Sequence, residues 1–103
     1  MITIQHKETE KNGVFEPWMR AIEEGACTES VQVGEMTYQR PTSQRMIFDH
    51  TRVFDGFEGR GIAGQMVLAA VDFARLNSRF IIPVCSYART LLTRTDEYKD
   101  ILA

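Results

Sequence analysis

The chain has 103 residues, 44% of them hydrophobic, and its 12 basic and 14 acidic residues give a formal net charge of -2. This length predicts one domain with a single modest core, too small for a cofactor domain plus a separate substrate domain. The two charge signs are interspersed without a basic run, which argues against nucleic-acid binding, and no apolar stretch is long enough to span a membrane.

The N-terminal residues lack the charge and apolar pattern of a signal peptide, so a cytoplasmic protein is expected. Cys27 and Cys85 have neither CxxC spacing nor a neighbouring His cluster, which argues against a zinc site and a disulfide framework. His6 and His50 are far apart in the sequence. Structural roles are therefore favoured for both, and no metal site is expected.

The first third of the chain predicts a hairpin followed by an ambiguous segment. Residues 2–7 alternate apolar and polar side chains, as in a half-buried strand, and Asn12-Gly13 indicates a hairpin turn. Residues 14–33 fit either a broken strand or a short helix that Pro17 begins and Gly25 ends.

A second antiparallel hairpin is predicted from residues 35–40 and 45–53, which flank Pro41-Thr42-Ser43. Strict alternation along its second strand predicts two faces. Because both carry apolar residues, this strand is expected to be central. One face holds Met46, Phe48, His50 and Arg52, and the other holds Ile47, Asp49, Thr51 and Val53.

Residues 62–77 are the clearest element, with apolar side chains at helical spacing. Residues 80–84 predict a buried strand, in which Pro83 has no N–H and favours an opening of the sheet. Ser86 is expected to cap a last helix, and Thr95 to begin a short turn. This order of elements indicates an α+β or mixed α/β fold.

The turn before the long helix reads Gly59-Arg60-Gly61-Ile62-Ala63-Gly64. A helix N-terminus exposes N–H groups that favour phosphate; the glycines allow close approach, and Arg60 can add a charge contact. Only one further strand follows and no acidic residue stands about twenty residues on, which argues against a Rossmann fingerprint. The turn is therefore expected to bind a phosphate-bearing cofactor; the alternative is a tight turn alone.

The run Val53 to Ala63 resembles the acetyl-coenzyme A loop of the GCN5-related N-acetyltransferases, whose pattern is Q/R-x-x-G-x-G/A. Gly61 and Ala63 match, whereas Glu58 replaces a supporting Gln or Arg and places a negative charge near the phosphates. Similarity to very small family members extends over residues 34–103 through His50-Thr51-x-Val53, Pro83-Val84-Cys85-Ser86-Tyr87 and Glu97-Tyr98-Lys99-Asp100. It also places a strand within residues 14–33.

The resemblance implies a mostly antiparallel sheet with helices packed on it, in which strands 45–53 and 80–84 diverge to admit the pantetheine arm. It further implies that the first of these strands polarises the acetyl carbonyl and that the loop amides hold the pyrophosphate. The expected cofactor contacts are Thr51, Arg52, Val53, Gly59, Arg60, Gly61, Ile62, Ala63, Gly64 and Ser86.

Acetyl transfer needs an unprotonated amine, N–H donors for the developing oxyanion and a proton for the leaving thiolate. Cys85, before a helix N-terminus, is a candidate acyl-accepting nucleophile or a small buried residue. Tyr87 is a candidate proton donor or a packing aromatic. His50 is a candidate base, because imidazole titrates near neutral pH, or a structural hydrogen-bonding group.

The expected function is therefore transfer of an acetyl group from acetyl-coenzyme A to an amine acceptor, either a protein or a small molecule. One alternative is a coenzyme A-binding module without turnover, suggested by the small size and by Glu58. Another is an interaction protein that uses its sheet edge. The acceptor and the oligomeric state stay open.

Overall fold

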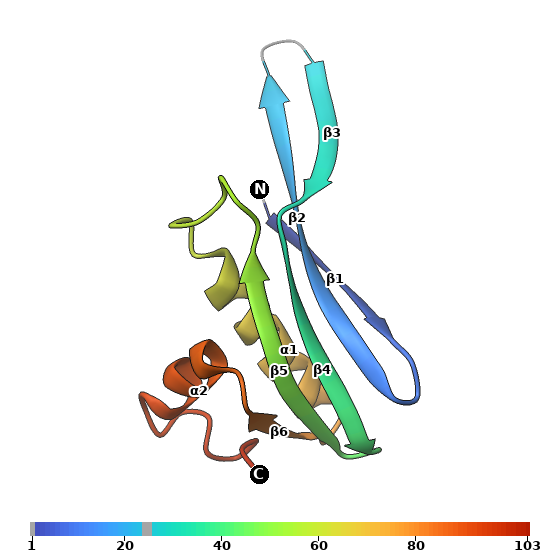
Figure 1. The fold of residues 1–103 in the computed structure, drawn as a ribbon, viewed down its shortest axis with the longest axis vertical. Helices are drawn as coiled ribbons and strands as arrows, with labels where there is room; N and C mark the ends of the chain where they lie inside the picture. Colours follow the sequence, from blue (N-terminus) through green and yellow to red (C-terminus); the bar gives the residue numbers. More distant parts are fainter. Residues whose placement is uncertain (1, 24–25) are drawn as a thin grey trace.

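The computed structural model describes the backbone of residues 2–23 and 26–103 and, outside residues 21–29, their side chains. The elements in order are β1 (Ile2–Glu8), β2 (Asn12–Glu23), β3 (Ala26–Gln32), β4 (Gly34–Thr42), β5 (Arg45–Val53), α1 (Ile62–Leu76), β6 (Phe80–Pro83) and α2 (Ser86–Thr93). The sheet has the order β1-β2-β4-β5-β6, with β3 paired to β2 (Figure 1). Among the described strands, β5 and β6 pair in parallel and the other pairs are antiparallel. The predicted mixed α+β fold with a mostly antiparallel sheet is confirmed.

Helix α1 covers one face of this sheet, behind β4 and β5 in Figure 1. Its predicted apolar stripe is buried there, and each large side chain removed from water contributes about 1.5–3 kcal/mol. Neither described helix is both long and apolar enough to cross a membrane. The buried side chains that meet in this core include Met36, Tyr38, Met46, Phe48, Ile62, Met66, Val67, Ala70, Val71 and Ala74.

The short helix considered for residues 14–33 is wrong, because β2 runs straight through Pro17. Along β2 the pairing partner changes from β4, at residues 12–15, to β3, at residues 18–23. Pro17 lies at this change, and its carbonyl accepts the N–H of Val33 at 2.9 Å. A missing N–H costs little where the partner strand changes. Gly25, the proposed helix end, lies outside the described residues.

The first hairpin turns at residues 9–11, earlier than Asn12-Gly13 suggested. The Thr9 N–H donates to the Asn12 carbonyl at 2.8 Å, and Gly13 is already paired with Glu8 within the strands. Gly13 is needed for a different reason: a Cβ atom there would lie 2.3 Å from Cζ of Tyr38. The glycine lets the Tyr38 ring pack directly on the backbone of β2.

The predicted faces of β5 are wrong beyond Phe48, because β5 carries a bulge. Tyr38 of β4 pairs with Phe48, but the preceding Thr37 pairs with His50, which leaves Asp49 as an extra residue. A bulge places two residues opposite one. Asp49 and His50 therefore both lie on the face of Thr37, away from α1.

Beyond the bulge, Thr51 and Val53 return to the helix-covered face. They pair with Met36 and Gly34, which are both buried. The pattern of the sequence could not show this reversal, because the bulge depends on pairing with β4. The consequence is that Thr51 and His50, which are adjacent in sequence, point to opposite faces of the sheet.

The C-terminal part also differs in detail from the expectation. Cys85, rather than Ser86, is the N-cap of α2. The short turn at Thr95 is present, since its hydroxyl accepts the Glu97 N–H at 3.3 Å. The last residues then bridge the outer edge of β6, where the Ile81 N–H donates to the carbonyl of Ile101 at 2.6 Å.

The structural role expected for His6 is present: its Nε2 is hydrogen-bonded to the Tyr38 hydroxyl, and its ring stacks on Phe15 at a centroid distance of 4.2 Å. Within the described side chains, no three His, Cys, Asp or Glu residues are grouped as for a metal ion. The side chain of Cys27 lies outside the described part, so the expected absence of a disulfide stays a prediction.

Candidate functional site

Strands β5 and β6 run side by side as far as Phe48 and Pro83 and then part. Beyond that point β5 stays paired with β4 as far as Val53. The Phe48 carbonyl accepts the N–H groups of both Val84, at 3.1 Å, and Cys85, at 2.8 Å, before the chain turns into α2. No described strand pairs with the other edge of β5 over residues 49–53. This opening agrees with the prediction from Pro83.

The glycine turn leads directly into α1. Gly59 and Gly61 have φ angles of +76° and +74°, in the left-handed region that other residues rarely adopt. Gly61 is the N-cap, no side chain caps the helix, and its first turn contains no acidic residue. A Cβ atom at either glycine would meet no described atom within 4 Å, so on this side the space over the turn is open. The uncapped N–H groups and this space suit a phosphate or pyrophosphate.

The side chain of Glu58 supports the glycine turn. Its Oε2 accepts the backbone N–H of Gly56 at 3.0 Å, so the carboxylate itself braces the start of the turn. Arg60 is turned toward the sheet, where its guanidinium contacts the Met19 sulfur at 3.7 Å and lies 5.8 Å from the centre of the Phe57 ring. In this arrangement Arg60 is held by its neighbours beside the turn.

A hollow of about 260 Å³ joins the turn to the end of β5 and to α2. Tyr87 forms its α2 side; the hydroxyl lies 3.5 Å from where a Cβ of Gly64 would stand. A second hollow, of about 240 Å³, shares Val53 with the first and includes Arg52, which is ion-paired with Glu35 at 3.8 Å. The first hollow is lined by Val53, Phe57, Glu58, Gly59, Gly61, Ile62, Ala63 and Tyr87.

Cys85 lies across the strand opening from Thr51. Its Sγ lies within hydrogen-bond distance, 3.3 Å, of the Thr51 hydroxyl, which can donate to the thiolate, and the side chain is half-buried. Burial raises the pKa of the thiol, but hydrogen bonding from the Thr51 hydroxyl and from the N–H groups of Ala88, Tyr87 and Thr51 outweighs burial. The pKa of Cys85 is therefore below its ordinary value.

The structure brings only part of the predicted set together. Cys85, Thr51 and Tyr87 lie on the helix-covered side of the opening, where Val53 and residues 59–64 also lie. His50 is exposed on the opposite face, beside Asp49. Ser86 is the exposed first residue of α2.

Three features were missed in the sequence. Phe57 lines the hollow, and an aromatic residue inside a glycine-rich turn was the available signal. The Thr51 hydroxyl contacts Cys85, although only the backbone of Thr51 was expected to matter. His50 and Thr51 were assigned to the wrong faces, because the bulge at Asp49 leaves no mark in the sequence pattern.

The comparisons with known proteins agree with this geometry. A family model described as GCN5-related N-acetyl-transferase matches residues 22–101. A solved NMR structure from Staphylococcus aureus, described as a "GCN5-like putative N-acetyltransferase", is similar with a TM-score of 0.62 and 28% identity. The match covers 96% of this chain and 87% of that chain. None of the curated proteins matches the sequence.

Proposed function

The chain belongs to the GCN5-related N-acetyltransferases, and we propose that it transfers an acetyl group from acetyl-coenzyme A to an amine. One observation carries the proposal: the uncapped N-terminus of α1, with the left-handed Gly61, lines one hollow with Val53, which ends the part of β5 that has left β6. An anion-binding helix end and an unpaired strand edge are thus next to each other, as a ligand with a pyrophosphate and an amide-containing arm requires.

In this proposal the amides of residues 59–64 hold the pyrophosphate, and Val53, Phe57 and Ile62 give apolar contacts to the arm. The free edge of β5 at Thr51 to Val53 offers backbone groups to the pantetheine amides. Acetyl-coenzyme A supplies the acetyl thioester when bound. Ser86 and Arg60 lie at the margins of this site and can contribute further polar contacts.

The chain's side chains then move protons for the transfer. His50 takes the proton that the amine loses as its nitrogen bonds to the acetyl carbon. Tyr87 gives a proton to the sulfur as the carbon–sulfur bond breaks. Backbone N–H groups of the free β5 edge stabilise the charge that develops on the carbonyl oxygen. The amine then reaches the opening from the face of His50, opposite Tyr87.

The contact between Cys85 and Thr51 favours a covalent variant of the same reaction. Here the Cys85 thiolate bonds to the acetyl carbon, the coenzyme thiolate leaves, and the amine afterwards displaces the Cys85 thiolate. Intact mass spectrometry after incubation with acetyl-coenzyme A should show one acetyl group on Cys85. Full activity of Cys85→Ala, with no adduct on the wild type, rules this variant out.

Two measurements test the proposed function. Calorimetric titration with acetyl-coenzyme A should show binding that Gly61→Trp abolishes, because the indole fills the open space over the turn. A thiol-release assay against a panel of amines and peptides should show steady production of free coenzyme A. Binding without release on any acceptor supports the non-catalytic module instead, and no binding at millimolar ligand refutes both.

A further inference from the structure

The sheet face that α1 does not cover carries a carboxylate in a fixed position. Asp49 follows the buried Phe48 and lies on this open face, beside Thr37 and Gln39. The Thr37 hydroxyl donates to its Oδ1 at 2.6 Å, and the Gln39 amide donates to its Oδ2 at 3.0 Å. Two residues of β4 therefore hold the exposed Asp49 carboxylate in one orientation and leave its outer lone pairs to solvent.

No cation of the described side chains is ion-paired with Asp49. Burial raises the pKa of Asp49. This effect is outweighed by hydrogen bonds from Thr37, Gln39 and its own backbone and by the nearby His50, so the pKa lies below its ordinary value. It is ionised at neutral pH.

Neighbouring acids on this face differ from Asp49 in this respect. Glu16 is paired with Lys7 at 3.2 Å, and Glu35 is paired with Arg52 at 3.8 Å. Of these three described acids, Asp49 is the one whose negative charge is open to an incoming cation.

The position of Asp49 connects it to the strand opening. It directly follows Phe48, the last residue of β5 that pairs with β6. His50 lies on the same face because of the bulge. A group bound to Asp49 therefore stands beside the proposed base and at the end of the paired part of the two strands.

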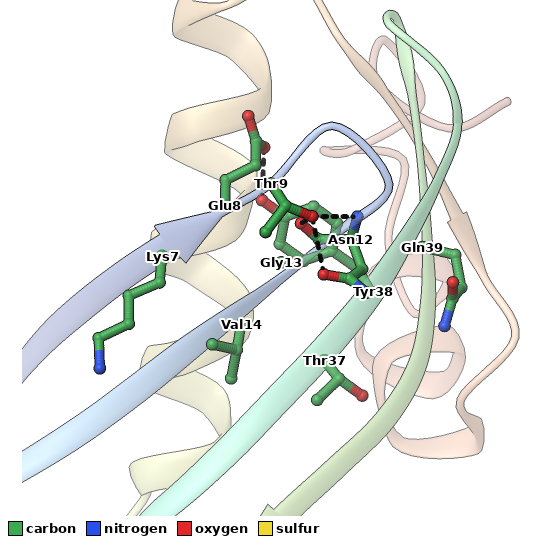
Figure 2. A pocket seen from close by; sticks show the side chains of 9 residues that line it. All are labelled: Lys7, Glu8, Thr9, Asn12, Gly13, Val14, Thr37, Tyr38 and Gln39. Atoms are coloured by element: carbon green, nitrogen blue, oxygen red, sulfur yellow. Dashed lines mark hydrogen bonds between the residues drawn. The ribbon is translucent and has the colours of Figure 1, made fainter.

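A hollow of about 440 Å³, within the usual size range for small-ligand sites, is lined by the two residues that bond to Asp49, Thr37 and Gln39. Figure 2 shows its lining side chains, two of which, Thr37 and Gln39, are the residues that hold Asp49. Its charged residues are already paired, Lys7 with Glu16 and Glu8 with arginines. The lining consists of Lys7, Glu8, Thr9, Asn12, Gly13, Val14, Thr37, Tyr38 and Gln39.

We propose that Asp49 binds the ammonium group of the acetyl acceptor, and that the adjoining hollow receives an uncharged polar body. The acceptor class is then a primary amine that arrives as a single cation, such as a lysine side chain flanked by amides. This inference rests on the proposed function and adds the recognition of its second substrate. Asp49 determines specificity; the bound ammonium group first loses one proton to solvent, and the neighbouring His50 takes the second proton as the amine nitrogen bonds to the acetyl carbon.

A matched pair of probes tests this role: Nα-acetyl-lysine amide, and Nα-acetyl-norleucine amide, which has no ammonium group. Binding is followed in ¹⁵N–¹H NMR spectra of the wild type, Asp49→Asn and the control Asp72→Asn, which removes a carboxylate from the exposed side of α1. The lysine probe should shift the signals of residues 37, 39, 49 and 50 in the wild type and in the control. Asp49→Asn should weaken its Kd about tenfold, which is about 1.4 kcal/mol.

The norleucine probe should bind the wild type no more tightly than it binds Asp49→Asn. In the thiol-release assay Asp49→Asn should raise KM for the lysine probe about tenfold and change kcat much less. Equal Kd values for the lysine probe in the wild type and Asp49→Asn, equal binding of both probes, or no binding of the lysine probe overturns the proposal.

Titration of the same variants with acetyl-coenzyme A separates the two proposals. Unchanged acetyl-coenzyme A binding with an unaltered response to the lysine probe overturns the acceptor site and leaves the proposed function standing. A wild type that binds no acetyl-coenzyme A refutes the proposed function itself. If Asp49→Asn does not give the spectrum of a folded protein, Asp49→Ser replaces it under the same criteria.

Discussion

The carboxylate of Glu8 should stabilise the fold in a pH-dependent way. It lies at the end of β1, where it accepts the Tyr38 hydroxyl at 2.6 Å, Arg40 at 3.1 Å and the guanidinium of Arg79. Only 21% of its side chain is exposed. The pKa of Glu8 is lowered from 4.5 to about 2, chiefly by the hydrogen bond from Arg79. Burial opposes this shift, whereas the hydrogen bond from Tyr38 and the positive charge of Arg40 add to it.

A shift from 4.5 to about 2 corresponds to about 3 kcal/mol if nothing screens the charges. Solvent reaches part of this cluster, so we expect about 1–2 kcal/mol. Because the folded protein binds this proton more weakly than the unfolded chain, the stabilisation is complete well above pH 4.5. It is lost as the pH falls from 4.5 through 2.

Urea unfolding of the wild type and Glu8→Gln at pH 7 and pH 3 measures this contribution. Glu8→Gln should lower the free energy of unfolding by about 1–2 kcal/mol at pH 7, and the difference should fall to less than half at pH 3. Glu10→Gln, which removes an exposed acid from the adjacent turn, is the control and should change little. A difference that does not depend on pH, or none at pH 7, would refute the reasoning.

Three further changes test other contacts. Gly61→Ala should cost about 1 kcal/mol of folding stability by urea unfolding, because φ is +74°, and an unchanged stability would contradict the left-handed N-cap. Thr51→Val should raise the pKa of Cys85, because it removes a hydrogen bond to the thiolate. The pH at which iodoacetamide alkylates Cys85 at half its maximal rate should therefore rise, and an identical pH profile would show that the hydroxyl is unimportant. Gly13→Ala should destabilise the protein by about 1–3 kcal/mol, since the new methyl group overlaps the Tyr38 ring; an unaltered thermal midpoint would contradict that packing.

Features of the fold that arise from local patterns could be predicted from the sequence. The helical spacing of apolar residues from Ile62 onward predicted both ends of α1 to within one residue, because a single buried stripe is enough to define a helix. Pro83 predicted where β6 stops pairing with β5, because proline lacks the backbone N–H that a further strand hydrogen bond would need. The left-handed Gly61 was expected for the same kind of reason.

Features that depend on a distant partner could not be predicted. Pro17 appeared to open a helix because nothing in the sequence shows that β2 changes partner at that residue. The extra residue Asp49 is defined only by the register against β4, and it moves both His50 and Thr51 to the faces opposite those expected. The segments that form the candidate site were therefore proposed from the sequence, but its division between two faces needed the structure.

The central claim is that acetyl-coenzyme A binds where the turn of residues 59–64 meets the free edge of β5. A ¹⁵N–¹H NMR titration with acetyl-coenzyme A tests it most directly, because each backbone amide reports separately. The account predicts that the signals of residues 59–64 and 51–53 shift together with one Kd, and that Gly61→Trp removes these shifts. Shifts confined to other residues, or an unchanged spectrum at millimolar acetyl-coenzyme A, would contradict it.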